Sequence, residues 1–385
     1  MNRKFLPFAL IALLDLQLRA APPPSATFAP PVNFPLGSRV PVSLALGDFE
    51  GDGMRDIAVA FSNGTQTILR NRTIGVAAPR TSSIDVSPLI SPAGGADVVF
   101  GDLNKDGVDD WITTFSGANR LAITPGGPVA SSSPTVPRPP REIRLADVDG
   151  DGNLDIIIGY DQTSLSSILR GRGDATVANA IDVIVGGGPA LAVVDWNGDG
   201  GLDIVAGSGG PARVSVAFNT GALTFAAPQV VASLPGTSGA FVEGIAVRSR
   251  SSTESAAALA ISVRDNATGQ RTLYLLQADD PSGAVPIATS NGSIHATFAD
   301  LNRDGRTDLV IVDSEARKLV VRAGTADGSL PVIAQVDLPP VDVTAAVVGD
   351  VSGDGVPDVL IGSADGTISV YVNTTAPTRH RAARH

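Results

Sequence analysis

The sequence predicts an all-β fold built from seven repeats, and three observations support this prediction. An acidic loop, clearest at residues 147–155, recurs six times along the chain. The first residues of successive loops lie 54, 45, 48, 105 and 50 positions apart, so the gap of 105 spans two periods, one of them without acids. Short β-branched runs flank the loops, as at residues 191–194 and 203–207. Strand-rich repeats of about 50 residues are typical of a β-propeller, here with seven blades of four antiparallel strands.

Each acidic loop places oxygen-bearing side chains at positions 1, 3, 5 and 9 and a glycine at position 6. The side chains are Asp48, Glu50, Asp52 and Asp56; Asp102, Asn104, Asp106 and Asp110; Asp147, Asp149, Asp151 and Asp155; Asp195, Asn197, Asp199 and Asp203; Asp300, Asn302, Asp304 and Asp308; and Asp350, Ser352, Asp354 and Asp358. Alternating oxygen donors before a sharp turn suit a hard cation that takes about six to eight oxygens. An EF-hand is excluded, because position 12 is never acidic and strands, not helices, flank the loop.

Composition narrows the possible functions. The net charge is −11, and 20 of the 39 acidic residues belong to the loops, so six bound Ca²⁺ ions would change the charge by +12, to +1. The excess of acidic residues is therefore explained by metal-binding loops. The few basic clusters argue against nucleic-acid binding. The chain has no cysteine, which excludes disulfides and thiol catalysis.

The N-terminal segment resembles a secretory signal peptide. Arg3 and Lys4 precede an apolar run at residues 5–14, and Ala20 and Ala21 precede a Pro-rich stretch. The apolar run is too short to span a bilayer, and no later run is long enough. We therefore expect residues 1–20 to direct export, and the protein to be secreted, periplasmic or at the cell surface. Residues 21–27 form a Pro/Ala-rich lead-in.

The propeller is predicted to occupy residues 28–373. The third repeat divides into strands at residues 142–146, 154–160, 166–170 and 176–185, with a turn at 171–174, and the fourth into strands at 191–194, 202–207, 213–219 and 225–233. The last repeat supplies only three strands, at residues 344–348, 358–362 and 368–373, whereas residues 28–36 form a lone strand before the first loop. We expect this lone strand to complete the last blade and close the ring. Residues 374–385 form a basic tail that we expect to be disordered.

The fifth repeat, residues 241–292, keeps its strands but has lost the acids. Arg248, Ser249 and Arg250 stand where the first ligands would be, before Glu254. This blade is therefore predicted to bind no metal, and a positive side chain replaces the charge of the cation.

The repeats resemble the FG-GAP/VCBS family, which includes the propeller heads of integrin α-subunits and many exported bacterial proteins. The resemblance covers nearly all of residues 28–373 and implies a loop that joins the first two strands of a blade. It also implies about six Ca²⁺ ions, held through positions 1, 3, 5 and 9 and the backbone carbonyl at position 7. These carbonyls would be those of Met54, Val108, Asn153, Gly201, Arg306 and Val356. Most of the Phe-Gly and Gly-Ala-Pro signature of integrin heads is missing, so no integrin-like adhesion is implied.

Four other features could carry function, and a structural role is favoured for each. His295, the one histidine outside the tail, is expected to line the central channel rather than to act in acid/base catalysis. Arg172-Gly173-Asp174 is expected to be a turn between the third and fourth strands rather than an adhesion motif. Trp111 and Trp196 are expected to pack in the core rather than to stack on sugars. Basic residues in turns between second and third strands, on the face opposite the loops, are expected to be ordinary solvated charge; they are Arg120, Arg213, Arg271, Arg317 and Lys318, with Arg138 and Arg141 in a longer connection.

The leading functional hypothesis is an exported, Ca²⁺-stabilised, monomeric propeller that binds a protein or a glycan. The alternative is a carbohydrate-active enzyme similar to a polysaccharide lyase. A cluster of His, Tyr, Lys and Arg around the channel would favour the enzyme, and a flat or acidic channel mouth would disfavour it.

Overall fold

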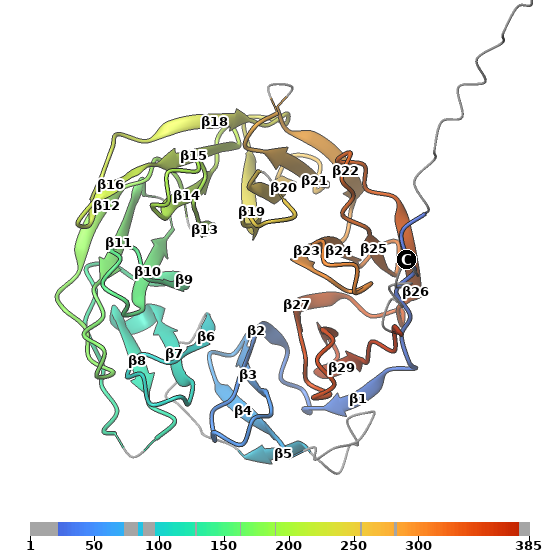
Figure 1. Ribbon diagram of the computed structural model, residues 1–385, viewed down its shortest axis with the longest axis horizontal. Coiled ribbons are helices and arrows are strands. Elements are labelled where there is room, and N and C mark those ends of the chain that lie inside the picture. Colours follow the sequence, from blue (N-terminus) through green and yellow to red (C-terminus); the bar gives the residue numbers. More distant parts are fainter. Residues whose placement is uncertain are drawn as a thin grey trace, which may run out of the picture.

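The computed structural model describes residues 22–72, 84–87, 97–127, 129–161, 163–188, 190–254, 256–280 and 283–376. Seven antiparallel blade sheets stand in a ring around a central axis (Figure 1), and their first strands surround a central channel that opens in a cavity. The seven-bladed β-propeller predicted from the sequence is confirmed. The expected signal peptide and residues 377–385 of the expected tail lie outside the described residues.

Each blade runs from a first strand at the channel to an outer strand at the rim. Blades 1 to 3 contain β2 (Pro41–Gly47), β3 (Asp56–Phe61), β4 (Gln66–Asn71) and β5 (Ile84–Ser87); β6 (Val98–Gly101), β7 (Asp110–Phe115) and β8 (Arg120–Thr124); and β9 (Pro140–Ala146), β10 (Asp155–Tyr160), β11 (Leu165–Leu169) and β12 (Ile181–Ile184). Blades 4 and 5 contain β13 (Leu191–Val194), β14 (Asp203–Ser208), β15 (Arg213–Ala217) and β18 (Gln229–Ser233); and β19 (Ala240–Arg248), β20 (Ala258–Asp265), β21 (Arg271–Gln277) and β22 (Val285–Ser290). Blades 6 and 7 contain β23 (Ile294–Ala299), β24 (Asp308–Asp313), β25 (Lys318–Arg322) and β26 (Val332–Asp337); and β27 (Val343–Gly349), β28 (Asp358–Ser363), β29 (Thr367–Tyr371) and β1 (Val32–Pro35).

Blades 2 and 4 depart from the simple four-strand pattern. In blade 2, Ser132 and Thr135 pair with β8 through isolated bridges and take the place of a regular fourth strand. In blade 4, a hairpin of β16 (Asn219–Gly221) and β17 (Thr224–Phe225) follows the third strand. The predicted strands 213–219 and 225–233 therefore each include part of this hairpin.

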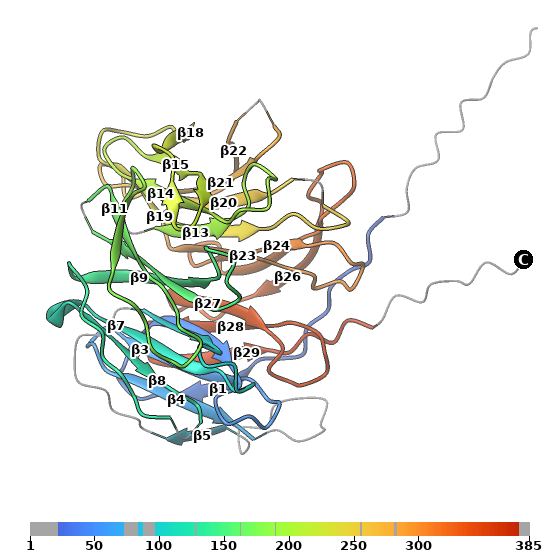
Figure 2. The same cartoon turned by 60° about the vertical axis from the view of Figure 1, so that its left-hand side comes forward.

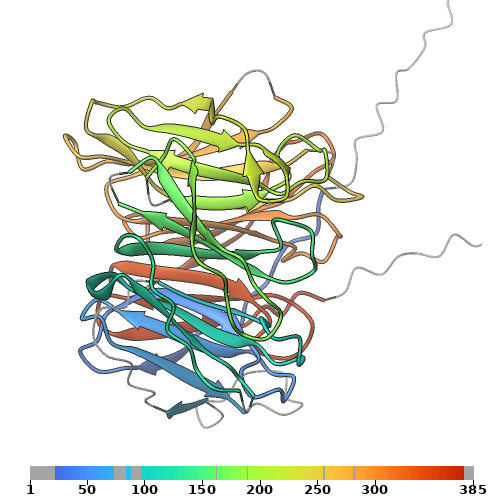
Figure 3. The same ribbon diagram turned by 90° about the vertical axis from the view of Figure 1, so that its left-hand side faces the viewer.

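The second strand of a blade is the most buried, because sheets of neighbouring blades cover both of its faces. Every residue of β10 and β24 is buried, and both strands are rich in Ile and Val, which pack well in pleated sheets. The core accordingly lies between blades: Ile112 of blade 2 packs in one cluster with Ile156 and Ile158 of blade 3. Figure 3 shows the strands of successive blades edge-on. The outer strand β12 is largely exposed.

The two ends of the described chain close the ring, as predicted. β1 pairs antiparallel with β29, in a register that places Val32 opposite Val370 and Asn33 opposite Ser369 (Figure 2). The closing contacts extend beyond the predicted limits of the propeller at both ends. Ala26 is buried in the core between blades 6 and 7, and the backbone N–H of Thr27 donates to Oγ1 of Thr375 at 2.9 Å. The contacts that close the ring thus include part of the predicted lead-in and the first residues of the predicted tail.

The only helical segment in the described ranges is the 3-10 turn η2 (Ser116–Ala118). Within those ranges, no helix is long and apolar enough to cross a membrane.

A disulfide across the closing strands should stabilise the ring. Asn33 and Ser369 are directly opposed, and their side chains are hydrogen-bonded at 2.8 Å. Directly opposed residues of antiparallel strands have Cα atoms about 4.5–5.5 Å apart, which suits a disulfide. Because it closes a loop of several hundred residues in a chain without cysteine, the N33C/S369C bridge should add about 3–5 kcal/mol to the free energy of unfolding. Denaturant melts of oxidised and reduced protein measure this difference, with each single cysteine variant as control. A bridge that does not form in the folded protein would contradict the closure.

Candidate metal centres

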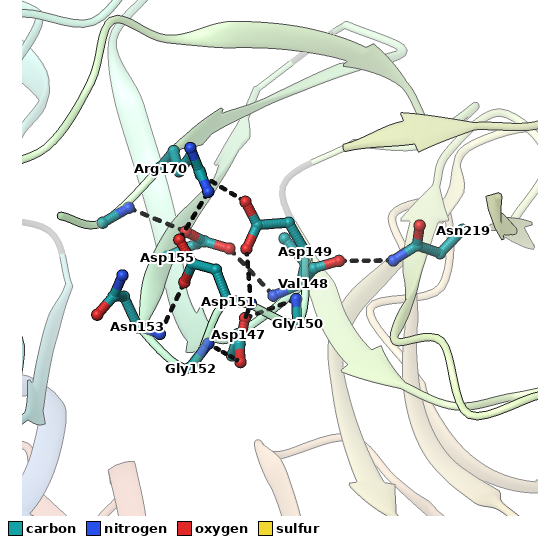
Figure 4. A network of polar contacts seen from close by, with 11 residues as sticks. Asp147, Val148, Asp149, Gly150, Asp151, Gly152, Asn153, Asp155, Arg170 and Asn219 are labelled. Carbon is teal, nitrogen blue, oxygen red and sulfur yellow. Dashed lines mark hydrogen bonds and ion pairs between the residues drawn. The ribbon is translucent and has the colours of Figure 1, made fainter. Parts of the chain in front are cut away.

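The acidic loops join the first and second strands of six blades, and the position 1 aspartate organises each loop. In blade 3, Oδ1 of Asp147 accepts the backbone N–H of Gly150 at 2.8 Å, and Oδ2 accepts that of Gly152 at 2.8 Å (Figure 4). Oδ1 of Asp151 accepts the backbone N–H of Asn153 at 2.8 Å. These short-range bonds curl the backbone around the side-chain oxygens and fix the direction in which they point.

The turn requires left-handed backbone at two positions. At position 6, the six glycines have φ between 82° and 91°, a region that costs side-chain-bearing residues energy. Position 4 also has positive φ in all six loops, including Lys105 at 62° and Arg303 at 60°. The glycine at position 6, which the sequence analysis singled out, is therefore explained by backbone geometry.

Blade 3 gathers its carboxylates most closely. Asp147, Asp149 and Asp151 each place an oxygen within 4.8 Å of the others. The guanidinium of Arg170, at the end of the third strand, donates to Asp149 at 2.5 Å and to Asp151 at 2.7 Å. Three carboxylates this close repel one another unless positive charge lies between them. An all-oxygen donor set that already attracts a cationic side chain is chemically suited to Ca²⁺.

The other five loops arrange their side chains differently. In blade 1, Glu50 pairs with Arg70 at 2.5 Å and does not form a cluster of three acidic ligand atoms with Asp48 and Asp52. In blades 2, 4 and 6, the asparagine at position 3 donates its amide to the aspartate at position 5; the pairs are Asn104 with Asp106 at 2.9 Å, Asn197 with Asp199 at 2.8 Å and Asn302 with Asp304 at 3.1 Å. In blade 7, Ser352 contacts Asp350 at 3.4 Å. Among the described residues, only blade 3 brings three acidic ligand atoms together.

The aspartate at position 9 has a structural role that its place in the motif does not reveal. In blade 4, Asp203 is fully buried, and its Oδ2 accepts the backbone N–H of Trp196 at 3.0 Å. Its Oδ1 accepts the backbone N–H of Asn219, beyond the third strand, at 2.8 Å. The same pair of bonds is made by Asp56, Asp110, Asp155, Asp308 and Asp358. In Asp308 and Asp358, Oδ2 also accepts the backbone N–H of position 3, from Asn302 at 3.2 Å and from Ser352 at 2.9 Å. Oδ1 keeps a second lone pair in all six aspartates, so these bonds leave position 9 able to bind a cation.

Burial of these aspartates opposes their ionisation. Desolvation raises the pKa of Asp308 to about 7, although its hydrogen bonds from Gly324 and Leu301 lower it. It likewise raises the pKa values of Asp56 and Asp358 to about 6. A neighbouring cation would favour the charged form.

Sequence reasoning missed three asparagines that link neighbouring blades. Their side-chain amides donate to the position 2 carbonyl of the preceding blade; the pairs are Asn71 with Val351 at 2.7 Å, Asn219 with Val148 at 2.7 Å and Asn373 with Leu301 at 2.9 Å. Figure 4 shows the second of these bonds. The sequence does contain a signal for these asparagines, because each one follows the position 9 aspartate of its own blade by 15 or 16 residues.

The fifth blade replaces the acidic loop with a protein-only network. Arg248 pairs with Glu254 at 3.3 Å, and Arg250 donates to the carbonyl of Trp196 in blade 4 at 3.1 Å. That carbonyl is at position 2, the position that the bridging asparagines use elsewhere. Glu254 accepts the backbone N–H of Thr307, in the loop of blade 6, at 2.8 Å. These arginines thus take part in the contacts between blades at the place of the lost acids.

The channel opens in a cavity of about 1220 Å³ on the face opposite the acidic loops. Its charged lining includes Asp97, Glu142, Arg144, Glu243, Arg264 and His295. His295 lies at the channel, as predicted, and burial lowers the pKa of its imidazole. Burial raises the pKa of Glu142 to about 7, against the opposing effect of Arg144.

The two tryptophans and the Arg172-Gly173-Asp174 segment have surroundings that fit a role in the structure. Trp111 and Trp196 are buried at 3% and 7% exposure, in agreement with packing roles. In the predicted turn, Asp174 accepts hydrogen bonds from the backbone N–H and Oγ1 of Thr176, at 3.0 and 2.6 Å. Its carboxylate is therefore engaged within its own turn.

Several of the basic turn residues are paired. Arg271 pairs with Glu243 at 2.7 Å, Lys318 pairs with Asp337, and the guanidinium of Arg120 lies 5.0 Å from the ring centroid of Phe115. Arg138 forms a two-point ion pair with Asp182, at 3.0 and 2.8 Å. Arg213 is exposed at the start of β15.

Removing one position 9 carboxylate should destabilise the propeller even without metal. Asp203→Ala leaves two buried backbone N–H groups without acceptors, which should lower the free energy of unfolding by about 3 kcal/mol. Asp199→Ala, in the same loop, removes an exposed acceptor that water replaces, so its cost should stay below about 1 kcal/mol. Urea melts in excess chelator compare the two variants. Equal losses of stability would contradict the structural role of position 9.

Comparison with known proteins agrees with this architecture. The FG-GAP-like repeat matches three stretches of the chain, residues 48–113, 147–206 and 300–361, and each begins at position 1 of an acidic loop. No curated protein matches the sequence.

Solved structures share the fold. The N-terminal part of BBS1, crystallised in complex with ARL6 and soaked with lead, is 15% identical, with a TM-score of 0.58 over 92% of this chain and 99% of the other. The mercury-soaked crystal of the same complex gives 14% identity and a TM-score of 0.57, over the same shares of both chains. Sqt1 of Saccharomyces cerevisiae is 8% identical, with a TM-score of 0.54 over 90% of this chain and 100% of the other. At these identities the likeness shows the fold alone. Together, the repeat matches, the recurring loop and the seven-bladed ring show that the chain belongs to the FG-GAP repeat family.

Proposed function

We propose that this protein is an exported, Ca²⁺-stabilised interaction scaffold that binds a protein partner or a glycan through the channel face. The separation of the two faces carries the proposal. All six acidic loops join first to second strands, and antiparallel topology places these turns at one end of the ring. The cavity opens at the other end, where second-to-third-strand turns such as residues 62–64 line it. One face is thus devoted to stability, and the other is free for recognition.

Calcium is the cation that these loops suit best. The donors are carboxylates, amide oxygens and, by resemblance, backbone carbonyls, which are hard ligands preferred by Ca²⁺. Extracellular modules bind Ca²⁺ with Kd values of about 10⁻⁴–10⁻³ M, which fits the export proposed from residues 1–20. In blade 3, a bound ion would take its oxygens from Asp147, Asp149 and Asp151, and Arg170 would have to move aside.

A protein partner is favoured over a glycan. Sugar-binding sites commonly present exposed aromatic rings, but both tryptophans and all three tyrosines of this chain are between 1% and 7% exposed. The BBS1 structures, which share the fold, were solved with a protein partner, ARL6. This likeness supports a protein-binding role by analogy only.

A polysaccharide-lyase-like activity is the second candidate, because ionisable groups do gather at the channel. His295, Glu142 and Glu243 line it together with Arg144 and Arg264. However, no lysine or tyrosine is among the residues that line this cavity. Incubation with polyuronates, followed by ultraviolet detection of unsaturated products, tests the activity. Turnover that His295→Ala abolishes in a folded protein would favour the enzyme over the scaffold.

Chelation should lower the thermal stability steeply. At a free Ca²⁺ concentration of ten times Kd, each site contributes about 1.4 kcal/mol, so six independent sites contribute roughly 8 kcal/mol. This is comparable to a whole-domain stability of about 5–15 kcal/mol. Melting curves with millimolar Ca²⁺ and with chelator measure the effect, and Mg²⁺ is the control. An unchanged melting temperature would remove the stabilising role from the proposal.

The stoichiometry should be six Ca²⁺ ions per chain, with blade 5 empty. Asp147→Asn should remove one site and reduce the count to five, because it replaces one carboxylate oxygen with an amide NH2 group that cannot bind a cation. The remaining oxygen still accepts part of the loop N–H groups that Asp147 holds through both of its oxygens. Anomalous scattering from crystals grown with a lanthanide locates the ions, and calorimetry counts them. Density beside Arg248 and Arg250 would show that blade 5 also binds metal.

The scaffold role is tested with the folded, Ca²⁺-loaded protein. Immobilised protein is exposed to the extracellular fraction of the producing cells, and each retained protein or glycan is purified and titrated against it. We expect one saturable partner whose binding is lost with chelator. Retention that is equally strong on heat-denatured protein would contradict a folded recognition surface.

A further inference from the structure

We propose that the channel mouth binds an acidic peptide segment, whose carboxylates are held by Arg141 and Arg264. This rests on the proposed scaffold function and specifies the chemistry of its ligand. In the cavity, the inner acceptors already have partners within the protein, whereas some of the donors do not.

The acids of the lining are largely occupied by internal partners. Oδ1 of Asp97 accepts from Oγ of Ser43 at 2.6 Å, and Oδ2 accepts from the backbone N–H of Ile143 at 2.9 Å. Glu142 pairs with Arg144 and also accepts the backbone N–H of Leu191 at 3.3 Å.

The third acid is occupied in the same way. Both oxygens of Glu243 accept from the guanidinium of Arg271, at 2.7 and 3.2 Å. Asp161 differs, since it is exposed in a turn at the edge of the cavity, where water solvates it. The inner acids therefore have little capacity left to bind a cationic ligand.

The arginines of the lining have spare donors. A guanidinium carries five N–H groups, and that of Arg264 approaches Glu243 only at 3.7 Å, beyond hydrogen-bond distance. Its Nε is buried, whereas the side chain as a whole is 41% exposed, so the donors that a ligand can reach are those of the two terminal nitrogens. Arg141 is exposed on the same cavity, at the start of β9. Free donors beside occupied acceptors favour an anion, and a planar guanidinium binds a carboxylate through two parallel bonds.

Apolar surface in the cavity favours a peptide as the carrier of that carboxylate. Val42, Leu44, Phe241 and Val347 line it, from three different blades, and Val42 is 39% exposed. A uronate chain would leave these side chains in contact with polar hydroxyls, whereas alternating acidic and apolar residues match both parts of the lining. The volume of about 1220 Å³ is enough for several residues of an extended segment.

The test uses a fluorescein-labelled peptide, (Glu-Val)₄, in anisotropy titrations against the full Ca²⁺-loaded chain. We expect saturable binding that weakens with added salt and falls at least tenfold in R141Q/R264Q. Neither arginine makes a buried ion pair, so the variant should melt at the temperature of the unchanged protein. The matched control is R213Q/R317Q, which removes the same charge from exposed residues outside the cavity and should bind normally.

Three results would overturn the inference. The uncharged peptide (Gln-Val)₄ could bind as tightly, the control variant could lose as much affinity as R141Q/R264Q, or oligogalacturonate could bind where the peptide does not. The last outcome would assign the cavity to an acidic glycan. If a partner captured by the scaffold experiment binds R141Q/R264Q normally, the channel site is wrong and the scaffold role stands.

Discussion

The fold depends on a buried carboxylate that ties together three segments of each blade with an acidic loop. An aspartate begins the second strand, where neighbouring sheets leave at most 1% of it exposed. A charge so placed is costly unless it is hydrogen-bonded, and the backbone meets this requirement with N–H groups from the loop and from beyond the third strand. The carboxylate therefore fixes the position of the loop relative to two strands. The aspartate at position 9, the most deeply buried part of the motif, thus helps to hold the oxygens of the loop in place.

The same loop also joins each blade to its neighbours. Its position 2 residue donates an N–H to the buried aspartate and, in four blades, presents its carbonyl to a side chain of the following blade. Three of these side chains are asparagines, and the fourth is Arg250 of blade 5, which has no acidic loop. A long cationic side chain thus makes the link where the acidic loop has been lost. The ring remains continuous because the contact depends on the carbonyl and not on a cation.

Much of this architecture was predictable from the sequence, because it is encoded in local periodicity. The spacing of the aspartates gives the number of blades, and the missing fourth strand of the last repeat gives the closure by residues 28–36. The arrangement of the loop side chains was not predictable. Glu50 occupies a ligand position, yet it turns toward Arg70, which lies 20 residues away on another strand. The cavity was equally hidden, since its arginines come from different blades and only the closed ring brings them together.

The two ends of a first strand lie on opposite faces of the ring, and the strand connects the acidic loop with the cavity. In blade 3, β9 begins at the cavity with Arg141 and Glu142 and leads into the loop at Asp147, five residues beyond Glu142. Five residues of strand span about 17 Å, and hydrogen bonds to β10 hold almost the whole length. A cation that ordered the loop would restrain the start of the second strand, and through this ladder it would restrain the residues of β9 at the cavity. Without a cation, repulsion among the loop carboxylates would loosen the same pair of hydrogen-bonded strands. Metal binding on one face would therefore set how rigidly β9 presents Arg141 on the opposite face, whereas Arg264 belongs to blade 5, which has no acidic loop.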